Sequence, residues 1–133
     1  MSRPPNTIVL LGGGGMLGTD LAAALQVAGM TPVVLDLPEC DVTNADHLRA
    51  ALTDVDAVVN CAAFTNVDGA ETARETAHAV NAEAPGVLGH LARERGVHVL
   101  HIGTDFVFDG HLDRPYGETD TTSPLSVYGT TKL

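Results

Sequence analysis

The sequence is poor in basic residues, because its 133 residues include a single lysine and the formal net charge is −10. Nucleic acids and anionic membranes are bound through basic patches, so neither is expected as a partner. No run of eighteen apolar residues is present, which argues against a membrane-spanning helix. Residues 1–5 lead directly into a strand-like segment without a signal-peptide pattern, and a cytoplasmic protein is expected.

Cysteine is almost absent as well, with only Cys40 and Cys61. Their separation fits neither a zinc-binding pattern nor a small disulfide scaffold, so two buried, reduced thiols are expected. The six histidines show no ligand spacing and are interpreted as surface or packing residues: His47, His78, His90, His98, His101 and His111. No metal site is expected.

The residues that are present alternate between short apolar runs and helical spacings, and 44% are hydrophobic, as in one packed domain. Strands are predicted at residues 7–11, 32–36, 56–61 and 97–102. Helices are predicted from Met16 to a stop at Gly29, from a cap at Thr43 or Asn44 past Leu52, in broken form from 67 to 95, and after Pro124. Residues 103–122 have the composition of a loop.

Strands that alternate with helices predict right-handed crossovers and a doubly wound parallel α/β sheet, with helices on both faces. The expected strand order, numbered along the chain, is 3-2-1-4. In such sheets ligands bind at the carboxyl ends of the strands where the order reverses, which places the predicted site between strands one and four. The glycines after residue 11 and the segment 103–105 both arrive at this crevice.

A glycine-rich loop follows the first strand and fits two patterns, Gly12-x-x-Gly15-x-x-Gly18 and Gly13-x-Gly15-x-x-Gly18. Glycine lets backbone N–H groups and a helix N-terminus approach a pyrophosphate, and Gly18 lets the helix pack closely on the strand. Asp36 ends the second strand eighteen residues later, where an acid can accept a hydrogen bond from a ribose 2′-OH. No arginine follows to bind a 2′-phosphate, so the pattern favours NAD(H) over NADP(H).

Small side chains, Ala62 and Ala63, follow the third strand and suit a wall beside a flat cofactor. Tight packing under a helix explains these alanines equally well. Asp41 and Val42, after the second strand, are expected near the adenine. Asp41 is equally well interpreted as a turn residue or as a cap for the next helix.

Tyr128 and Lys132 stand four residues apart, and in a helix they share one face. A phenol has an ordinary pKa of about 10, and a neighbouring ammonium favours the phenolate. Such a tyrosine can give a proton to a carbonyl oxygen as hydride arrives on the carbon. Thr104, just after the fourth strand, can donate a second hydrogen bond to that oxygen. The combination with the glycine loop predicts a nicotinamide-dependent reductase with Thr104, Tyr128 and Lys132 as catalytic residues.

Longer motifs carry a family resemblance: LGGGGMLG at 11–18, NCAAFTNVDGAE at 60–71, VNA at 80–82, GTDFVFDG at 103–110, PYGE at 115–118 with Asp120 and Pro124, and YGTTK at 128–132. At these residues the chain resembles the extended short-chain dehydrogenase/reductases, and among them the dTDP-4-dehydrorhamnose reductase family. Gly103 and Phe106 stand where that family commonly has serine and tyrosine. Neither difference removes a proposed catalytic group.

The resemblance implies a Rossmann domain and hydride transfer from NADH or NADPH to the C4 ketone of a dTDP-4-keto-deoxysugar, dTDP-4-dehydro-L-rhamnose. The product would be dTDP-L-rhamnose, a precursor of surface polysaccharide. Tyr128 would be the general acid, Lys132 would tune it and hold the nicotinamide ribose, and Thr104 would orient the ketone. The other coenzyme-binding residues would be Gly12, Gly15, Met16, Leu17, Gly18, Asp36, Asp41, Val42, Ala62, Ala63 and Thr65.

By the same resemblance, the family's remaining strands and a smaller substrate domain would lie beyond Leu133. Residues 1–133 are then expected to be the incomplete Rossmann part of a longer enzyme, marginally stable and without turnover alone, and a homodimer would form through the C-terminal part. Two other functions stay open: a non-catalytic nucleotide-binding regulatory subunit of the same fold, and a nucleotide-sugar epimerase or dehydratase. The presence of Thr104, Tyr128 and Lys132 together argues against the regulatory subunit.

Overall fold

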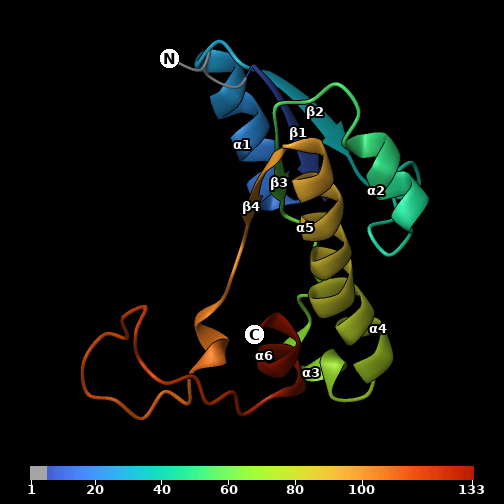
Figure 1. The fold of residues 1–133 in the computed structure, drawn as a ribbon. Coiled ribbons are helices and arrows are strands. Elements are labelled where there is room, and N and C mark those ends of the chain that lie inside the picture. Colours follow the sequence, from blue (N-terminus) through green and yellow to red (C-terminus); the bar gives the residue numbers. More distant parts are fainter. Residues whose placement is uncertain (1–5) are drawn as a thin grey trace.

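Four parallel strands form one sheet with helices on both faces in the computed structural model, which describes residues 6–133 (Figure 1). The strands are β1 (Thr7–Leu11), β2 (Thr31–Leu35), β3 (Ala57–Asn60) and β4 (His98–His101). Each strand begins and ends within one residue of its predicted range, and the doubly wound parallel architecture is confirmed. The prediction that no signal peptide occupies residues 1–5 lies outside the described residues.

The predicted strand order is wrong, because the observed order is β2-β1-β3-β4. β3 pairs with β1 and leaves β2 at an edge of the sheet. Pro32 in β2 explains this arrangement: proline has no N–H, and an interior strand needs hydrogen bonds on both sides. The order therefore reverses between β1 and β3, and the crevice at the carboxyl ends lies there rather than between the first and fourth strands.

Two apolar cores flank the sheet, because alternate residues of a strand point to opposite faces. One core joins the sheet to α1 (Met16–Val27), and the other joins it to α2 (Ala45–Ala51) and α5 (Ala84–Arg95). The first contains Ile8, Leu10 and Val59 with Leu21, Ala22 and Leu25. The second contains Val9, Leu11 and Val58 with Leu48, Leu52, Leu88 and Leu91. β1 contributes to both cores and is buried on both faces, as predicted.

The ends of the helices follow local signals. Asn44 caps α2, because its Oδ1 accepts hydrogen bonds from the N–H groups of Asp46 (2.9 Å) and His47 (3.3 Å). This selects Asn44 over Thr43 as the cap. Gly29, with φ +76°, follows α1, and Gly96, with φ +66°, ends α5.

The segment 67–95 is a broken helix, as predicted. It consists of α3 (Val67–Ala70), α4 (Arg74–His78), the π-helical turn η1 (Ala79–Glu83) and α5. Single π-helical turns occur frequently at functional sites. η1 carries the buried side chain of Asn81, which contacts the chain that leaves β3.

The C-terminal part has little regular structure between residues 103 and 122, as predicted. The exception is the 3-10 turn η2 (Asp105–Val107), which contacts the last helix, α6 (Val127–Lys132). α6 begins after Ser126, whose hydroxyl accepts a hydrogen bond from the N–H of Gly129 (3.0 Å). Both η2 and α6 lie beyond the carboxyl ends of the strands, on the same side as the glycine loop (Figure 1).

β4 forms an open, apolar edge of the sheet, where Val99 and Leu100 are 40% and 56% exposed.

Among residues 6–133, no helix has both the length and the apolar character needed to cross a membrane. The same part of the chain holds no group of three His, Cys, Asp or Glu side chains arranged for a metal ion.

Candidate active site

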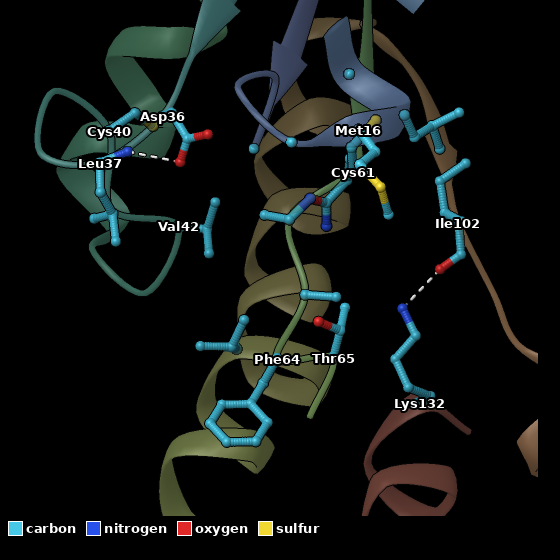
Figure 2. Close-up of a pocket in the computed structure, with 18 of the residues that line it drawn as sticks. Met16, Asp36, Leu37, Cys40, Val42, Cys61, Phe64, Thr65, Ile102 and Lys132 are labelled. Carbon is cyan, nitrogen blue, oxygen red and sulfur yellow. Dashed lines mark hydrogen bonds between the residues drawn. The ribbon is translucent and has the colours of Figure 1, made fainter. Parts of the chain in front are cut away.

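A pocket of about 570 Å³ lies at the carboxyl ends of the strands and reaches from the loop after β2 to α6 (Figure 2). Its lining includes every residue predicted to bind a coenzyme: Gly12, Gly15, Met16, Leu17, Gly18, Asp36, Asp41, Val42, Ala62, Ala63, Thr65, Tyr128 and Lys132. Residues from both halves of the sequence thus share one cavity.

Eight further residues, outside the predicted set, also line the pocket: Leu37, Cys40, Asn60, Cys61, Phe64, Val80, Ile102 and Gly103. Most of them are next to predicted residues in the sequence, so their place in the lining follows from the position of those neighbours. Val80 belongs to the stretch 80–82 that carries the family resemblance, but it adjoins no predicted site residue, and its place in the pocket depends on how the segment 67–95 folds.

The glycine loop between β1 and α1 is packed too tightly for side chains at several positions, of which Gly12 and Gly18 are examples. A Cβ atom on Gly12, which has φ +66°, would lie 2.7 Å from the backbone of Ala62. A Cβ atom on Gly18 would lie 2.5 Å from the Cα of Gly13. The loop therefore lies directly against the chain after β3, and the N-terminus of α1 offers its free N–H groups to the pocket, as binding of a pyrophosphate requires.

Two carboxylates mark the β2 end of the pocket. Asp36 accepts hydrogen bonds from the N–H groups of Gly14 (3.0 Å) and Leu37 (2.8 Å), so it holds the glycine loop as well as lining the pocket. Asp41 accepts hydrogen bonds from the hydroxyl (2.7 Å) and N–H (2.9 Å) of Thr43, and these lower the pKa of its carboxyl. Asp41 is thus a turn residue, one of its predicted interpretations, that also lines the pocket.

The two cysteines are free thiols, as predicted, and both line the pocket. Cys40 is buried and Cys61 is half-buried, and burial raises the pKa of each thiol. The thiols are therefore neutral at pH 7 and contribute weakly polar surface. Cys40 lies near Asp36, whereas Cys61 lies near Met16 in the middle of the pocket (Figure 2).

Asn60 ties the end of β3 to β4. Its Oδ1 accepts a hydrogen bond from the N–H of Ala62 (3.1 Å), and its Nδ2 lies 3.2 Å from Nδ1 of His101. An amide nitrogen only donates, so Nδ1 of His101 accepts and the ring proton sits on Nε2. Burial, and then the charge of Lys132, lower the pKa of His101 and favour this neutral ring.

Asn81 joins the wall of the pocket to α6. Its side chain forms hydrogen bonds with both backbone groups of Phe64. Oδ1 accepts from the N–H (2.8 Å), and Nδ2 donates to the carbonyl (3.1 Å). It also donates to the hydroxyl of Thr131 (3.0 Å), which in turn donates to the carbonyl of Tyr128 (2.8 Å). This connection could not be predicted from residue spacing, because the partners are 17 and 50 positions from Asn81.

Tyr128 and Lys132 lie on α6 and both line the pocket, as their spacing predicted. Nζ of Lys132 donates a hydrogen bond to the carbonyl of Ile102 (2.7 Å; Figure 2), and burial lowers the pKa of this amine. The ring of Tyr128 packs edge-on against Phe106, with centroids 5.5 Å apart and planes at 81°. A phenol and an amine thus occupy the end of the pocket opposite Asp36.

Thr104 is the predicted catalytic residue that does not line the pocket. Its Oγ1 accepts a hydrogen bond from the N–H of Phe106 (3.2 Å) and caps η2. Its neighbour Gly103 does line the pocket, so Thr104 lies at its border. Donation of a hydrogen bond by Thr104 to a substrate stays a prediction.

Known proteins share this arrangement over nearly the whole chain. dTDP-4-dehydrorhamnose reductase of Mycolicibacterium smegmatis is 44% identical over 128 residues, which are 95% of this chain and 39% of the relative. The crystal structure of a dTDP-4-dehydrorhamnose reductase from Clostridium acetobutylicum superposes with a TM-score of 0.90 at 33% identity, over 95% of this chain and 46% of that chain. That of Bacillus anthracis, in complex with NADP, has a TM-score of 0.88 at 28% identity, over 99% and 48%.

The chain therefore spans less than half the length of each of these three relatives. A family model, described as the RmlD substrate binding domain, matches residues 6–133. The structure describes these same residues, so the strands, the glycine loop and α6 all fall within the match. The chain belongs to the RmlD substrate binding domain family.

Proposed function

We propose that the pocket binds a nicotinamide adenine dinucleotide in an extended form. The observation that carries this proposal is the order of three groups along one cavity. Asp36 lies at one end, Met16 of the glycine loop and α1 in the middle, and Lys132 at the other end, on the helix that also carries Tyr128. A dinucleotide presents an adenosine ribose, a pyrophosphate and a nicotinamide ribose in the same order. Met16 and Leu17, at the start of α1, would lie at the pyrophosphate.

The proposed reaction is the reduction of a ketone, for which the coenzyme supplies the hydride. Tyr128 donates the proton to the ketone oxygen, and the positive charge of Lys132 stabilises the phenolate that remains. Lys132 also holds the nicotinamide ribose, from its position beside the carbonyl of Ile102. Thr104 donates a second hydrogen bond to the ketone oxygen.

The proposed substrate is the C4 ketone of dTDP-4-dehydro-L-rhamnose, and the product is dTDP-L-rhamnose, a precursor of surface polysaccharide. The names of the relatives support this choice, together with the combination of Tyr128, Lys132 and Thr104. The substrate domain, the homodimer and the cytoplasmic location that the resemblance implies belong to the same proposal. Free cysteines agree with a reducing compartment.

The proposed coenzyme is NADH in preference to NADPH. Asp36 supports this preference, because its carboxylate lies at the end of the pocket where the adenosine ribose would sit and would repel a 2′-phosphate. The relative from Bacillus anthracis binds NADP, so the preference needs a direct comparison of dissociation constants.

Titration of the 133-residue chain with NADH tests coenzyme binding. The chain has no tryptophan, so the fluorescence of reduced nicotinamide is measured without interference. We expect saturable binding and competition by ADP. A folded chain that binds neither NADH nor NADPH would contradict the proposal.

Gly15 offers a variant that separates binding from folding. A Cβ atom there would meet its nearest neighbour at 3.5 Å, an ordinary contact, yet it would project at the proposed pyrophosphate site. We expect Gly15→Ala to fold normally and to bind NADH about tenfold more weakly. The matched control is Gly89→Ala, whose added Cβ meets open space on α5.

The reaction class is tested in the presence of the complete substrate-binding part, because residues 1–133 alone are expected to lack turnover. The experiment adds dTDP-4-dehydro-L-rhamnose and follows the absorbance of NADH. A reductase consumes NADH stoichiometrically, whereas an epimerase or dehydratase recycles the coenzyme. Binding of NADH with no effect on any ketone substrate in the presence of the complete substrate-binding part would instead support the regulatory-subunit function.

A further inference from the structure

Phe106 joins the segment of Thr104 to the segment of Tyr128. Its N–H donates to the hydroxyl oxygen of Thr104 (3.2 Å), and its ring packs edge-on against the ring of Tyr128 (5.5 Å between centroids). Edge-to-face pairs of this kind are favourable and restrict the relative orientation of the rings. One residue therefore contacts two of the three proposed catalytic residues.

The backbone carbonyl of Phe106 lies directly against Gly129. A Cβ atom on Gly129 would lie closer than 3.0 Å to the carbonyl oxygen of Phe106 and 3.1 Å from Cβ of Pro124. Gly129 is buried, and it occupies a six-residue helix that glycine itself weakens. Gly86 and Gly89, on α5, differ in that an added Cβ would meet nothing within 4 Å. A close approach of two backbones explains glycine at position 129.

We propose that Gly129 and Phe106 are positioning residues that set the distance between Tyr128 and Thr104; this inference rests on the proposed function. Because Gly129 has no side chain, α6 packs directly against the carbonyl of Phe106. The ring of Phe106 then orients Tyr128, while its N–H fixes the turn that begins at Thr104. A proton donor and a second hydrogen-bond donor can converge on one ketone oxygen only when this spacing is kept.

The expected sensitivity is high, because a misplacement of about 1 Å in a catalytic site can reduce the rate by on the order of a hundredfold. Gly129→Ala forces apart α6 and η2 and so displaces Tyr128 and Lys132, which line the α6 end of the pocket. The atoms nearest to an added Cβ on Gly129 belong to Phe106 and Pro124, so we expect the β2 end and the glycine loop to keep their geometry.

Gly129→Ala, with Gly89→Ala as control, tests the inference in the 133-residue chain. NADH reaches the α6 end, whereas ADP occupies only the β2 end and the glycine loop. We expect Gly129→Ala to weaken NADH binding about tenfold and ADP binding less than about twofold. General destabilisation would instead weaken both nucleotides equally. The nuclear Overhauser contact between the rings of Phe106 and Tyr128 is expected to disappear in Gly129→Ala and to persist in the control.

The contact between the two rings can be assigned in the spectrum, because the chain has two tyrosines. In a Tyr116→Phe background, every tyrosine signal comes from Tyr128. If Gly129→Ala does not fold, Phe106→Leu replaces it, since this variant keeps the backbone and removes the ring. Phe106→Tyr keeps an aromatic ring and is expected to restore NADH binding to within about twofold of the original chain.

An unchanged ring contact and an unchanged ratio of NADH to ADP affinity in Gly129→Ala would overturn the inference. So would equal NADH affinities of Phe106→Leu and Phe106→Tyr. If the original chain binds neither nucleotide, the proposed function fails, and loss or persistence of the ring contact still decides whether Gly129 positions Tyr128.

Discussion

The two ends of the pocket are built in different ways. At the β2 end, Asp41 bonds Thr43 two positions away, and Asp36 bonds Gly14 22 positions away. At the α6 end, Lys132 reaches Ile102 across 30 positions, and Asn81 reaches Thr131 across 50. The β2 end therefore forms within the single unit β1-α1-β2 and the loop that follows it, whereas the α6 end forms only when more distant segments have docked.

The two ends of the pocket also differ in how deeply their hydrogen-bonded groups are buried. Asn81 and Thr131 are 3% and 5% exposed, whereas the hydrogen bonds that Asp36 accepts lie at the surface. A buried polar group left without its partner costs about 1–3 kcal/mol. Changes at the α6 end should therefore reduce both stability and coenzyme binding, and changes at the β2 end should reduce binding alone.

The glycine loop between these ends should be the most sensitive position. Gly18→Ala places a Cβ atom 2.5 Å from the Cα of Gly13, and neither backbone can move without separating α1 from β1. We expect the free energy of unfolding to fall by about 3 kcal/mol, measured by urea denaturation. Gly89→Ala is the control and should be stabilising by up to about 1 kcal/mol, because alanine favours a helix. Equal stability of the two variants would show that the loop is not tightly packed.

Asn81→Leu is the next largest change and acts at the α6 end. It leaves both backbone groups of Phe64 without their partner, and we expect the free energy of unfolding to fall by about 2 kcal/mol. Thr131→Val removes one hydroxyl of the same network and should cost about 1–2 kcal/mol. Thr76→Val, at an exposed position of α4, is the control. An Asn81→Leu chain as stable as the control would remove the distinction between the two ends.

Asp36→Ala should change binding without a comparable change in stability. Its carboxylate bonds exposed backbone, so the free energy of unfolding is expected to change by less than about 1 kcal/mol. We expect NADH affinity to fall about tenfold and NADPH affinity to fall less, because the repulsion of a 2′-phosphate is removed. The readout is the ratio of the two dissociation constants. An unchanged ratio would mean that Asp36 does not face the adenosine ribose.

The smallest expected effect is a pH dependence through His101. Burial, and then Lys132, lower the pKa of His101 below its ordinary value of 6.5, so folding favours the neutral ring that accepts the hydrogen bond from Asn60. Stability is then complete above pH 6.5 and falls as the pH drops toward the lowered pKa, because the unfolded chain takes up the proton first. His101→Gln keeps an acceptor and should flatten this dependence in urea denaturation at about pH 7 and pH 5. His90→Gln, on the surface of α5, should not.

Much of the fold could be predicted from the sequence, because strand and helix limits depend on local patterns such as the glycines after β1 and the cap at Asn44. The order of the strands could not be read from the alternation alone. Pro32 contains the necessary signal, since proline favours an edge strand, whereas the alternation of strands and helices does not specify the strand order.

The candidate site divides in the same way. Its glycines, Asp36 and the pair Tyr128 and Lys132 were predictable, because each has a recognised residue type at a fixed spacing. Asn81 and Phe106 were not, since their roles arise from contacts that exist only in the folded chain. Sequence patterns predicted the groups that we propose to carry the chemistry, whereas the residues proposed to position them required coordinates.

The central claim is that one extended coenzyme joins the two ends of the pocket, and nuclear Overhauser contacts from bound NADH test it most directly. The account predicts contacts from the nicotinamide ring to Tyr128 and from the adenine to Val42, in a chain where both residues line the same cavity. A nicotinamide that contacts Val42, or a bound NADH with no contact to Tyr128, would contradict it.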